Sequence, residues 1–587
     1  MDSDGTRPPR NDLRDDRRAG SGRFGLRPAL FGAAMTMVAA ALHYAGYLDS
    51  GFNASDDGHY AQVAYELWLG TDPHAIRFGY GLAWFKLGEG LFALSGPSYH
   101  LVQQLFFALL AATAGLVFLT VARVTCRFTP AAAAALLAAA VPAFPPTAFY
   151  AFCTLLNLAL QVELARRWRR LEPWDAVPGA LALAVTFQIR PDFGYAFAVP
   201  YAFLLLLGGL AGNQTGGPMG GRRSRWRRTA GLAGAALAGF AAGHLPLLAD
   251  GLAKGYLDLV AADYLRYPGL LLQYVLAGLR QAGDGGAATA TTAAAGTLLA
   301  RPPLSALWRG SWQDAAQTVV VYAPLLGMAG FALFHAAAVL RRRSAAAFDR
   351  LLLAAVLLAA PLASFPHYFL FRPDLAHVAN FMPGYLVLAA VFVWELAGRR
   401  GGHGAVLPAA LAILTVVAGV AVYGWVGLTT PGTGSIALAQ GRDQPFIAEN
   451  GVAVRVAAAE LPWLQGVRKL VAEHSAPGDR IVCVPFCPGV AFMTGRRMML
   501  REYYVDDSFL LTDPGWIERT IEQTRRERTP VVVVVDWAIN GTEISRFQVW
   551  ARPYVAFLEE AGYRRVDLPG GSVYLAPLDP PRMPQKP

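Results

Sequence analysis

Long apolar runs separated by short polar segments dominate the first 430 residues of the chain. A helix needs about 20 apolar residues to cross the hydrocarbon core of a bilayer. Runs that approach or exceed this length lie near residues 28–48, 100–122, 131–147, 149–165, 176–190, 193–211, 229–249, 318–340, 350–366, 378–397 and 404–428. The pattern predicts a polytopic α-helical membrane protein with about eleven transmembrane helices.

Arginine clusters test this arrangement, because short cytoplasmic loops of membrane proteins are rich in Lys and Arg. If the N-terminus is cytoplasmic, the chain returns to that side after every second span. The five returns coincide with five basic clusters, Arg123–Arg127, Arg166–Arg170, Arg222–Arg228, Arg341–Arg343 and Arg399–Arg400. The agreement requires a tight outer hairpin at 190–192, and it places everything beyond residue 430 outside the cytoplasm.

The predicted spans and the loops between them make up a membrane domain at residues 29–429. The segments outside the spans are polar or mixed. Residues 1–28 read as a disordered cytoplasmic tail. A cleaved signal peptide is the alternative for the first apolar run, but its length and the long charged tail favour a retained helix. Two long outer segments follow, 49–99 and 250–317. The second carries tyrosines typical of interfacial helices and an Ala/Gly/Thr-rich stretch that suits a flexible loop, at Tyr256, Tyr264, Tyr267, Tyr274 and 282–298.

After residue 430 the sequence becomes charged and mixed, as in a water-soluble domain. We predict helices over 452–474, 514–528 and 546–561, and strands at 480–484, 531–535 and 572–575. Strands that alternate with helices favour a small α/β domain with a largely parallel sheet. Residues 430–587 therefore form a predicted extracytoplasmic α/β domain, and no Gly-rich phosphate loop or nucleophile elbow marks it as a separate catalyst.

The composition agrees with a membrane protein. Hydrophobic residues make up 55% of the chain and charged residues 16%, against about 25% charged in soluble domains. The net charge of +10 lies in the loop clusters, which argues against a nucleic-acid partner. Of four cysteines, Cys126 and Cys153 read as packing residues. Cys483 and Cys487 could pair in an oxidising compartment, although an extended strand would hold them too far apart.

Two adjacent carboxylates follow the first predicted span. Asp56 and Asp57 lie in the run 55–60 (SDDGHY). A carboxyl group at the membrane surface next to an apolar bundle can have a raised pKa and serve as a general base. The structural alternative is that Asp57 caps a helix that begins near His59, and the residues alone leave the two interpretations equal.

Two charged turns are predicted on the same side. Arg190 and Asp192 lie between the fifth and sixth spans, and Arg372, Asp374 and His377 lie between the ninth and tenth. Ionisable residues at helix ends inside a bundle are candidates for function, and arginine suits bidentate binding of a phosphate. The alternative is an Arg–Asp pair that only closes each turn.

The order of these features resembles the GT-C glycosyltransferases, including the protein O-mannosyltransferases and the lipid A aminoarabinose transferases. In the latter the first outer loop reads like Asp-Glu-Thr-Arg-Tyr-Ala. The similar positions here are Asp56-Asp57-Gly58-His59-Tyr60-Ala61, then Leu67-Trp68-Leu69-Gly70-Thr71-Asp72-Pro73, Tyr80-Gly81 and Gly96-Pro97-Ser98. The layout is similar over residues 30–400, but the matching sequence is confined to short patches.

The resemblance implies transfer of a sugar from a polyprenyl-phosphate carrier to an acceptor on the outer side, with inversion at the anomeric carbon. It assigns the base to Asp56 and an orienting role to Asp57, whose counterpart is Glu. The phosphate leaving group needs cations, for which Arg190 and Arg372 are the candidates. The residues expected beside them at the substrate are His59, Tyr60, Asp192, Asp374 and His377.

No cofactor is expected. The oligosaccharyltransferase branch is metal-dependent and carries a Trp-Trp-Asp signature, and residues 430–587 contain no such run, so a tightly bound metal is not expected either. The expected partners are a polyprenyl-phosphate sugar, membrane lipids and a glycan, lipid or protein acceptor, in the plasma (inner) membrane. A non-catalytic scaffold and a lipid-linked saccharide transporter in cell-envelope assembly are the alternatives.

Overall fold

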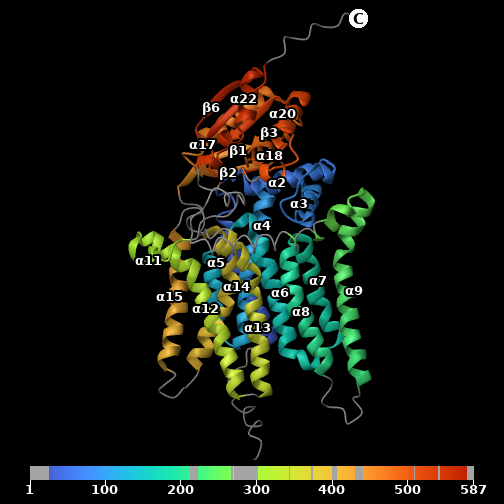
Figure 1. Ribbon diagram of the computed structural model, residues 1–587, viewed down its shortest axis with the longest axis vertical. Coiled ribbons are helices and arrows are strands. Elements are labelled where there is room, and N and C mark those ends of the chain that lie inside the picture. Colours follow the sequence, from blue (N-terminus) through green and yellow to red (C-terminus); the bar gives the residue numbers. More distant parts are fainter. Residues whose placement is uncertain are drawn as a thin grey trace, which may run out of the picture.

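The computed structural model describes residues 25–211, 222–262, 264–265, 269, 302–342, 344–371, 375–398, 406–429, 441–507, 509–539 and 543–577. The long helices run side by side as a bundle, and the C-terminal domain stands on one end of it (Figure 1). Two shorter helices lie between the bundle and this domain. The predicted tail up to residue 24 and the predicted flexible loop at 282–298 lie outside the described residues.

A helix is present at each of the eleven predicted spans. These helices are α1 (Leu26–Ala45), α4 (Tyr99–Thr125), α5 (Phe128–Ala140), α6 (Ala148–Arg167), α7 (Pro173–Ile189), α8 (Pro191–Ala211), α9 (Arg222–Lys254), α12 (Trp312–Arg342), α13 (Ala345–Phe365), α14 (Leu375–Gly398) and α15 (Val406–Thr429). Among the described residues, eight helices are long and apolar enough to cross a membrane, and α5, α7 and α15 are not among them. The multi-pass architecture is thus confirmed, whereas the count of eleven spans is not.

Helix α4 packs against four other helices of the bundle, α1, α5, α6 and α14. Small residues allow the closest of these approaches. A Cβ atom at Gly115 of α4 would lie 3.0 Å from the backbone oxygen of Ala33 in α1. Without a hydrophobic driving force between helices in lipid, such close contacts are the main source of helix association.

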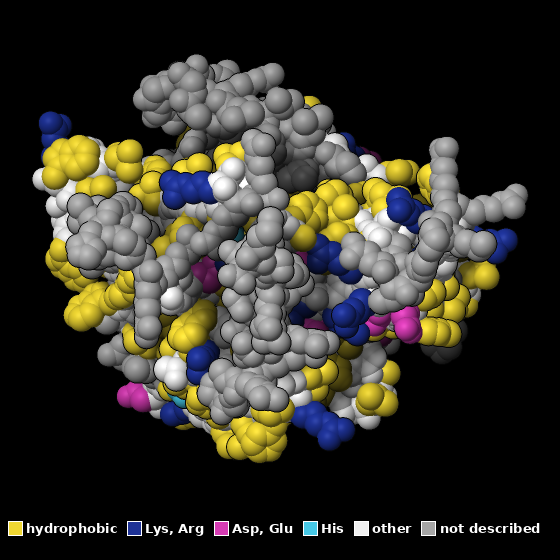
Figure 2. Space-filling view, turned by 90° about the horizontal axis from the view of Figure 1, so that it is seen from below, with side chains coloured by type: hydrophobic (Ala, Val, Ile, Leu, Met, Phe, Trp, Pro, Cys, Tyr) yellow, Lys and Arg dark blue, Asp and Glu magenta, His cyan; other side chains and the backbone are white. Residues whose placement is uncertain are grey.

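The first three predicted basic clusters meet at the end of the bundle away from the C-terminal domain. The fourth cluster is only partly described, and the fifth, Arg399–Arg400, lies outside the described residues. Arg123 of the first cluster forms an ion pair with Glu163, Nη2 to Oε2 3.0 Å, beside the second cluster. Arg169 of the second cluster pairs with Asp349 in α13, and Arg228 of the third donates to the carbonyl oxygen of Arg169. Figure 2 shows Lys and Arg side chains among hydrophobic ones on this end. Clusters far apart in sequence therefore share one side, as the span pattern predicts.

The tight hairpin is confirmed as well. Helix α7 ends at Ile189 and α8 begins at Pro191. The first outer segment packs directly on this turn, since Gly81 N–H donates to the carbonyl oxygen of Ile189 at 3.0 Å. A Cβ atom at Gly81 would lie 2.1 Å from the oxygen of Gln188, so only glycine fits. The turn and the first outer segment are on the same side of the bundle.

The first outer segment folds into two helices, α2 (Asp56–Trp68) and α3 (Leu82–Ser95), which pack on each other. Figure 1 places both between the bundle and the C-terminal domain. Almost all of α2 is buried, from Asp57 to Leu67. It is therefore an internal element that connects the two halves of the molecule, not a surface loop.

The C-terminal domain contains a small hairpin and a five-stranded sheet. Strands β1 (Arg442–Ala448) and β2 (Val452–Ala457) pair antiparallel, and helix α17 (Leu461–His474) follows. The larger sheet has the strand order β4-β3-β5-β7-β6. Its strands are β3 (Arg480–Val484), β4 (Arg497–Met498), β5 (Val531–Val535), β6 (Arg564–Leu568) and β7 (Gly571–Leu575), and the helices between them are α18 (Gly489–Met493), α19 (Phe509–Thr512), α20 (Trp516–Glu527), α21 (Phe547–Trp550) and α22 (Arg552–Glu560).

The predicted α/β character of this domain is confirmed, with three corrections. The expected helix over 452–474 begins only at Leu461, because Val452, Val454 and Val456 alternate buried and exposed positions as a strand does. The sheet is mixed, since β4, β3 and β5 are parallel whereas β7 runs antiparallel to β5. The expected helix over 546–561 is split into α21 and α22. The domain boundary at residue 430 stays a prediction.

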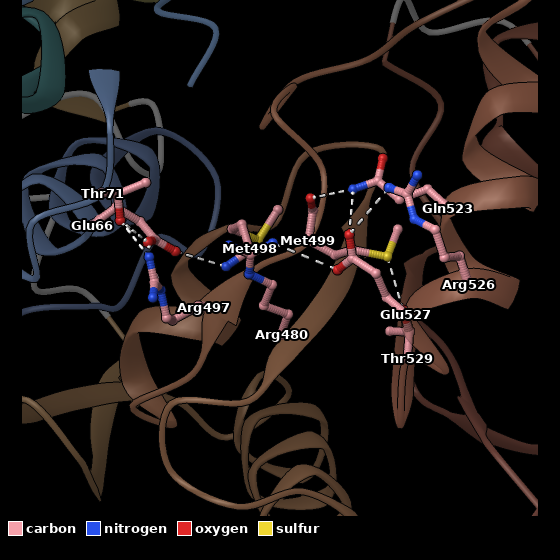
Figure 3. Close-up of polar contacts among 10 residues, drawn as sticks. All are labelled: Glu66, Thr71, Arg480, Arg497, Met498, Met499, Gln523, Arg526, Glu527 and Thr529. Carbon is pink, nitrogen blue, oxygen red and sulfur yellow. Dashed lines mark hydrogen bonds and ion pairs between the residues drawn. The ribbon is translucent and has the colours of Figure 1, made fainter. Parts of the chain in front are cut away.

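Buried charge fixes the C-terminal domain to the first outer segment. Glu66 of α2 is 1% exposed and accepts hydrogen bonds from Arg497 Nε at 3.0 Å and from the backbone N–H of Met498 at 2.8 Å, both in β4. Its other partners are Thr71 and Gln62. Figure 3 shows this carboxylate at the junction of the two parts. A second ion pair joins Arg455 of β2 to Asp49.

Candidate functional site

The first outer segment begins with a turn that fixes where α2 starts and which way its side chains point. Asn53 Oδ1 accepts hydrogen bonds from the backbone N–H groups of Ser55 and Asp56, at 2.9 and 3.1 Å, and from the Ser55 hydroxyl. An asparagine that bonds the following backbone in this way starts a helix turn. Helix α2 therefore begins at Asp56, and Asp57 lies in its first turn.

Asp57 points inward from this turn to α4. Its Oδ2 atom accepts hydrogen bonds from the Tyr99 hydroxyl at 2.9 Å and from Gln103 Nε2 at 2.6 Å. Tyr99 and Gln103 are four residues apart, so they lie on one face of α4. The interpretation of Asp57 as a helix cap is wrong, because Ser55 occupies the N-cap position and the Asp57 carboxylate bonds to another helix.

Burial gives this carboxylate unusual chemistry. Asp57 is 7% exposed, and burial raises its pKa to about 7, against the lowering effect of the bonds from Gln103 and Tyr99. Its Oδ1 atom is buried and has no hydrogen-bond partner within the described part of the chain. A carboxylate held by one oxygen, with the second oxygen unbonded and a pKa near neutrality, is suited to accept a proton.

A cavity of about 400 Å³ opens beside Asp57. It lies between the bundle and the C-terminal domain, since both contribute to its wall. The lining residues are Ser50, Gly51, Phe52, Asn53, Ala54, Ser55, Asp57, Gln103, Phe107, Phe144, Pro145, Pro146, Arg442, Glu460, Trp463, Phe486, Cys487, Val535 and Trp537. Its size is within the range of about 300–1,000 Å³ typical of ligand sites.

The two adjacent carboxylates differ in position. Asp57 lines the cavity, whereas Asp56 does not. Consecutive residues of a helix point about 100° apart, which agrees with only one of the two side chains reaching the cavity wall. The geometry favours Asp57 over Asp56 as the residue that meets a substrate, which reverses the order expected from the resemblance.

His59 and Tyr60 are packing residues in this structure rather than part of the cavity wall. The ring of His59 stacks on Phe85 with centroids 5.5 Å apart, and burial lowers its pKa to about 4, so the imidazole is neutral at pH 7. The ring of Tyr60 lies 4.7 Å from that of Trp84. His59 still touches the site indirectly, because its ring meets the edge of Phe486, which lines the cavity.

The Arg190–Asp192 pair closes its turn. Arg190 Nε and Nη2 donate to the two carboxylate oxygens of Asp192 at 2.8 and 2.7 Å. The guanidinium also donates to the Tyr150 hydroxyl and lies over the Tyr150 ring. Both charged residues are buried, and neither lines the cavity. This pairing agrees with the structural alternative, and the role expected of Arg190 at the donor phosphate stays a prediction.

The second charged turn is only partly described. Arg372 and Asp374 lie outside the described residues. His377 is in the first turn of α14 and does not line the cavity. One turn further, Asn380 donates to the Thr147 hydroxyl at 2.8 Å, next to Pro145 and Pro146 of the cavity wall. The start of α14 is therefore close to the site, and the roles expected of these three residues stay predictions.

Sequence reasoning missed Tyr99 and Gln103 of α4, which hold Asp57, and every cavity residue of the C-terminal domain. Arg442 of β1 lines the cavity and donates through Nη1 to the carbonyl oxygen of Ser50 at 3.0 Å. A Cβ atom at Gly51 would lie 2.5 Å from this nitrogen, and Gly51 has φ +88°. Trp463 and Trp537 were not predicted either. A usable signal existed only for Trp537, which follows the end of a buried strand, where α/β domains place ligand contacts.

No three His, Cys, Asp or Glu side chains in the described ranges come close enough together to hold a metal ion. Cys483 and Cys487 are free thiols, although both are buried in the C-terminal domain. Cys487 lines the cavity, and burial raises the pKa of its thiol well above the usual value.

No family model matches the chain, and no match is found among curated proteins. Solved structures similar to this chain include two of oligosaccharyltransferases and one of ArnT. One is the oligosaccharyltransferase AglB from Archaeoglobus fulgidus with an inhibitory peptide and a dolichol-phosphate, at TM-score 0.42 and 14% identity over 94% of this chain and 75% of that chain. Another is an Archaeoglobus fulgidus oligosaccharyltransferase with Zn and sulfate, at TM-score 0.41 and 15% identity over 93% and 74%.

The third is ArnT from Cupriavidus metallidurans bound to undecaprenyl phosphate, at TM-score 0.45 and 13% identity over 92% of this chain and 97% of that chain. These proteins are GT-C glycosyltransferases, the superfamily that the first outer segment resembles. At such identities and TM-scores, the likeness by itself assigns neither membership nor activity.

Proposed function

We propose that this chain is an integral membrane glycosyltransferase that moves a sugar from a polyprenyl-phosphate donor to a hydroxyl acceptor on the outer side of the membrane. The observation that supports it most is the carboxylate of Asp57. It is buried, its pKa is raised to about 7, and its Oδ1 atom is unbonded beside a cavity between the bundle and the C-terminal domain. The site lies where a membrane-anchored donor and a water-soluble acceptor can meet.

In the proposed reaction Asp57 is the general base. Its Oδ1 atom takes the proton of the acceptor hydroxyl as the acceptor oxygen attacks the anomeric carbon. The bond between that carbon and the phosphate oxygen breaks, and the polyprenyl phosphate leaves with the electron pair. Attack opposite the leaving group inverts the anomeric centre. Tyr99 and Gln103 hold Oδ2 and thereby orient the base.

The experiment is sugar transfer from a panel of polyprenyl-phosphate sugars by purified protein, with the thermal unfolding of each variant measured alongside. Asp57→Asn keeps the size of the side chain and an oxygen for Tyr99 and Gln103, but it cannot take a proton. A general base contributes about 10²–10⁴-fold to the rate, so we expect a loss of this order.

Asp56→Asn is the matched control, because it makes the same chemical change one position away and outside the cavity wall. We expect it to retain most activity. Loss in Asp56→Asn with normal transfer in Asp57→Asn would return the base to Asp56. Normal transfer in the double variant would exclude a catalytic role for this pair and favour a scaffold or a transporter.

A further inference from the structure

The sheet of the C-terminal domain has a topological switch point that faces the cavity. Strands β3 and β5 are parallel neighbours, with Val482 paired to Val532 and Val484 to Val534. The chain leaves β3 toward β4 on one side and leaves β5 toward β6 and β7 on the other. In open α/β sheets, ligands bind in the crevice outside the carboxyl ends of two strands whose connections diverge in this way.

Aromatic side chains follow both strand ends. Phe486 comes two residues after β3, and Trp537 comes two residues after β5. Their rings are nearly parallel, at 18° with centroids 6.5 Å apart. Trp463 of α17 joins them, and all three line the same cavity as Asp57. The crevice of the sheet and the candidate catalytic cavity are therefore one space.

The first outer segment contributes Asp57 and residues 50–55 to the wall of this cavity, and the rest of the wall has two chemically different halves. The bundle contributes apolar side chains beyond Gln103, namely Phe107, Phe144, Pro145 and Pro146. The C-terminal domain contributes three aromatic rings, an acidic side chain and a basic side chain. These are Trp463, Phe486, Trp537, Glu460 and Arg442. The first half suits a group attached to a lipid, and the second suits a ligand that arrives from water.

A carbohydrate matches the second half. A sugar ring has an apolar face of C–H groups that can lie on an indole, and hydroxyl groups around its edge that carboxylate and guanidinium groups can bind. Trp537 is 38% exposed, so its ring is accessible. The volume of about 400 Å³ suits the end of an oligosaccharide rather than a whole chain.

Other acceptors fit this half less well. An extended peptide binds by adding a strand to an open sheet edge, whereas the crevice here lies at the ends of β3 and β5, which are both paired on either side. A lipid acceptor would keep its chain in the bilayer, next to the apolar half of the wall and away from Trp537.

We propose that the crevice at the carboxyl ends of β3 and β5 is the acceptor site, and that the acceptor is a carbohydrate. A terminal sugar ring lies against Trp537 and Trp463, with its hydroxyls near Glu460 and Arg442, and one hydroxyl reaches Asp57. The assignment of this ligand as an acceptor rests on the glycosyltransferase function proposed above. The C-terminal domain thus supplies substrate specificity, and the bundle supplies the base.

The test is equilibrium binding to the full-length protein in detergent micelles, measured by saturation-transfer NMR. The probes are neutral trisaccharides of mannose, arabinose and glucose, an uncharged Ala/Ser tetrapeptide and a short-chain polyprenyl phosphate. We expect saturable binding of at least one trisaccharide. Trp537→Ala should weaken it about tenfold or more, and Trp537→Phe should retain part of it, because a smaller ring still offers a flat face.

Trp68→Ala is the matched control. Trp68 has the same exposed fraction of 38%, is on the same side of the bundle in α2, and does not line the cavity. It should bind the trisaccharide as the unchanged protein does. Thermal unfolding of both tryptophan variants separates a lost contact from a lost fold.

Three results would overturn the inference. They are absence of binding by all three trisaccharides, equal binding by Trp537→Ala, and displacement of the bound trisaccharide by the tetrapeptide or by the polyprenyl phosphate. Asp57→Asn distinguishes this failure from failure of the proposed function. Asparagine still offers an oxygen to the acceptor hydroxyl, so this variant should keep most of its trisaccharide affinity while it loses transfer. Each hypothesis therefore fails in its own assay.

Discussion

Gly58 of α2 and Gly489 of α18 touch backbone to backbone at the edge of the candidate site. A Cβ atom at Gly58 would lie 2.4 Å from the Cα atom of Gly489. The N–H of Gly489 donates to the carbonyl oxygen of Ala54 at 2.8 Å. The C-terminal domain can approach α2 this closely only because neither residue has a side chain, and the cavity beside Asp57 depends on that approach.

Gly58→Ala should therefore push α18 of the C-terminal domain away from α2. An extra methyl group in a tight contact costs about 1–3 kcal/mol, partly offset by the higher helix propensity of alanine. We expect a lower unfolding temperature and reduced transfer. Thermal unfolding and the transfer assay measure the two effects.

Gly90→Ala is the control for helix propensity. Gly90 is in α3, and a Cβ atom there would meet nothing within 4 Å. We expect unchanged transfer and a stability equal to or above that of the unchanged protein. If Gly58→Ala behaves in the same way, the close contact has no role in the docking of the domain.

Transfer should depend on pH through Asp57. A base must be deprotonated, and burial raises the pKa of Asp57 to about 7. We expect kcat/KM to rise about tenfold per pH unit below pH 7 and to level off above it. An acid limb near pH 4 instead would assign the base to an exposed carboxylate, which titrates near its ordinary pKa.

The same pKa makes a prediction for stability. The folded protein binds the Asp57 proton more tightly than the unfolded chain does. The contribution of this residue to the free energy of unfolding therefore falls as the pH rises from about 4 to about 7 and this proton is lost. Asp57→Asn lacks that contribution. The unfolding temperature of Asp57→Asn, relative to the unchanged protein, should increase between pH 4 and pH 7, and a constant difference would contradict the raised pKa.

Glu66 should be critical for the attachment of the C-terminal domain. Glu66→Ala leaves the N–H of Met498 and the Nε–H of Arg497 without their acceptor, whereas Arg497 Nη2 still donates to Thr71. We expect a loss of about 2–3 kcal/mol, since Arg497 is partly exposed to water. Faster tryptic cleavage within residues 441–577 and a lower unfolding temperature would show it.

Glu473→Ala serves as the comparison for Glu66→Ala. Glu473 pairs with Lys469 at 3.9 Å on the surface of α17, and exposed pairs contribute about 0–1 kcal/mol. It should have nearly no effect on either measurement. Equal effects of the two variants would mean that the buried contact of Glu66 does not hold the domain.

Asp192→Asn tests whether Arg190 is structural. The change removes the charge of the buried carboxylate that pairs with the Arg190 guanidinium, and breaking a buried ion pair costs about 3–5 kcal/mol. We expect a lower unfolding temperature with donor binding unchanged in the fraction that folds. Asp567→Asn, which removes an exposed partner of Arg565, should change neither. Loss of donor affinity at normal stability would make Arg190 a phosphate ligand after all.

The orientation of the chain can be tested with reporter fusions. A reporter after Arg343 should be active in the cytoplasm, and one after Thr430 should be active in the outer compartment, since a basic cluster marks each predicted return. Cytoplasmic activity at Thr430 would place the C-terminal domain on the wrong side for the proposed reaction.

The chain's polar and apolar periodicity determined the architecture because the bilayer and the sheet each impose a simple rule. Apolar runs of span length predicted a helix at each of eleven places, and the arginine clusters predicted which helix ends would meet, as Arg169 and Asp349 do. The buried strand 531–535 was predicted at its observed bounds. These features depend on the length of each apolar run and on the chain crossing the membrane alternately in opposite directions. The sequence therefore suffices to predict them.

The tertiary structure alone decided which side chains meet in the site. The choice between Asp56 and Asp57 depends on the rotation of α2 about its axis. Asn53 sets this rotation at the start of the helix, and Tyr99 and Gln103 of α4 hold it through their bonds to Asp57. The contribution of Trp537 depends on how a domain more than 400 residues along the chain docks onto Gly58. Such choices are made by long-range packing. A rotation of α2 by one residue would bring Asp56, which does not line the cavity, to the place of Asp57, and no local pattern of residues records that rotation.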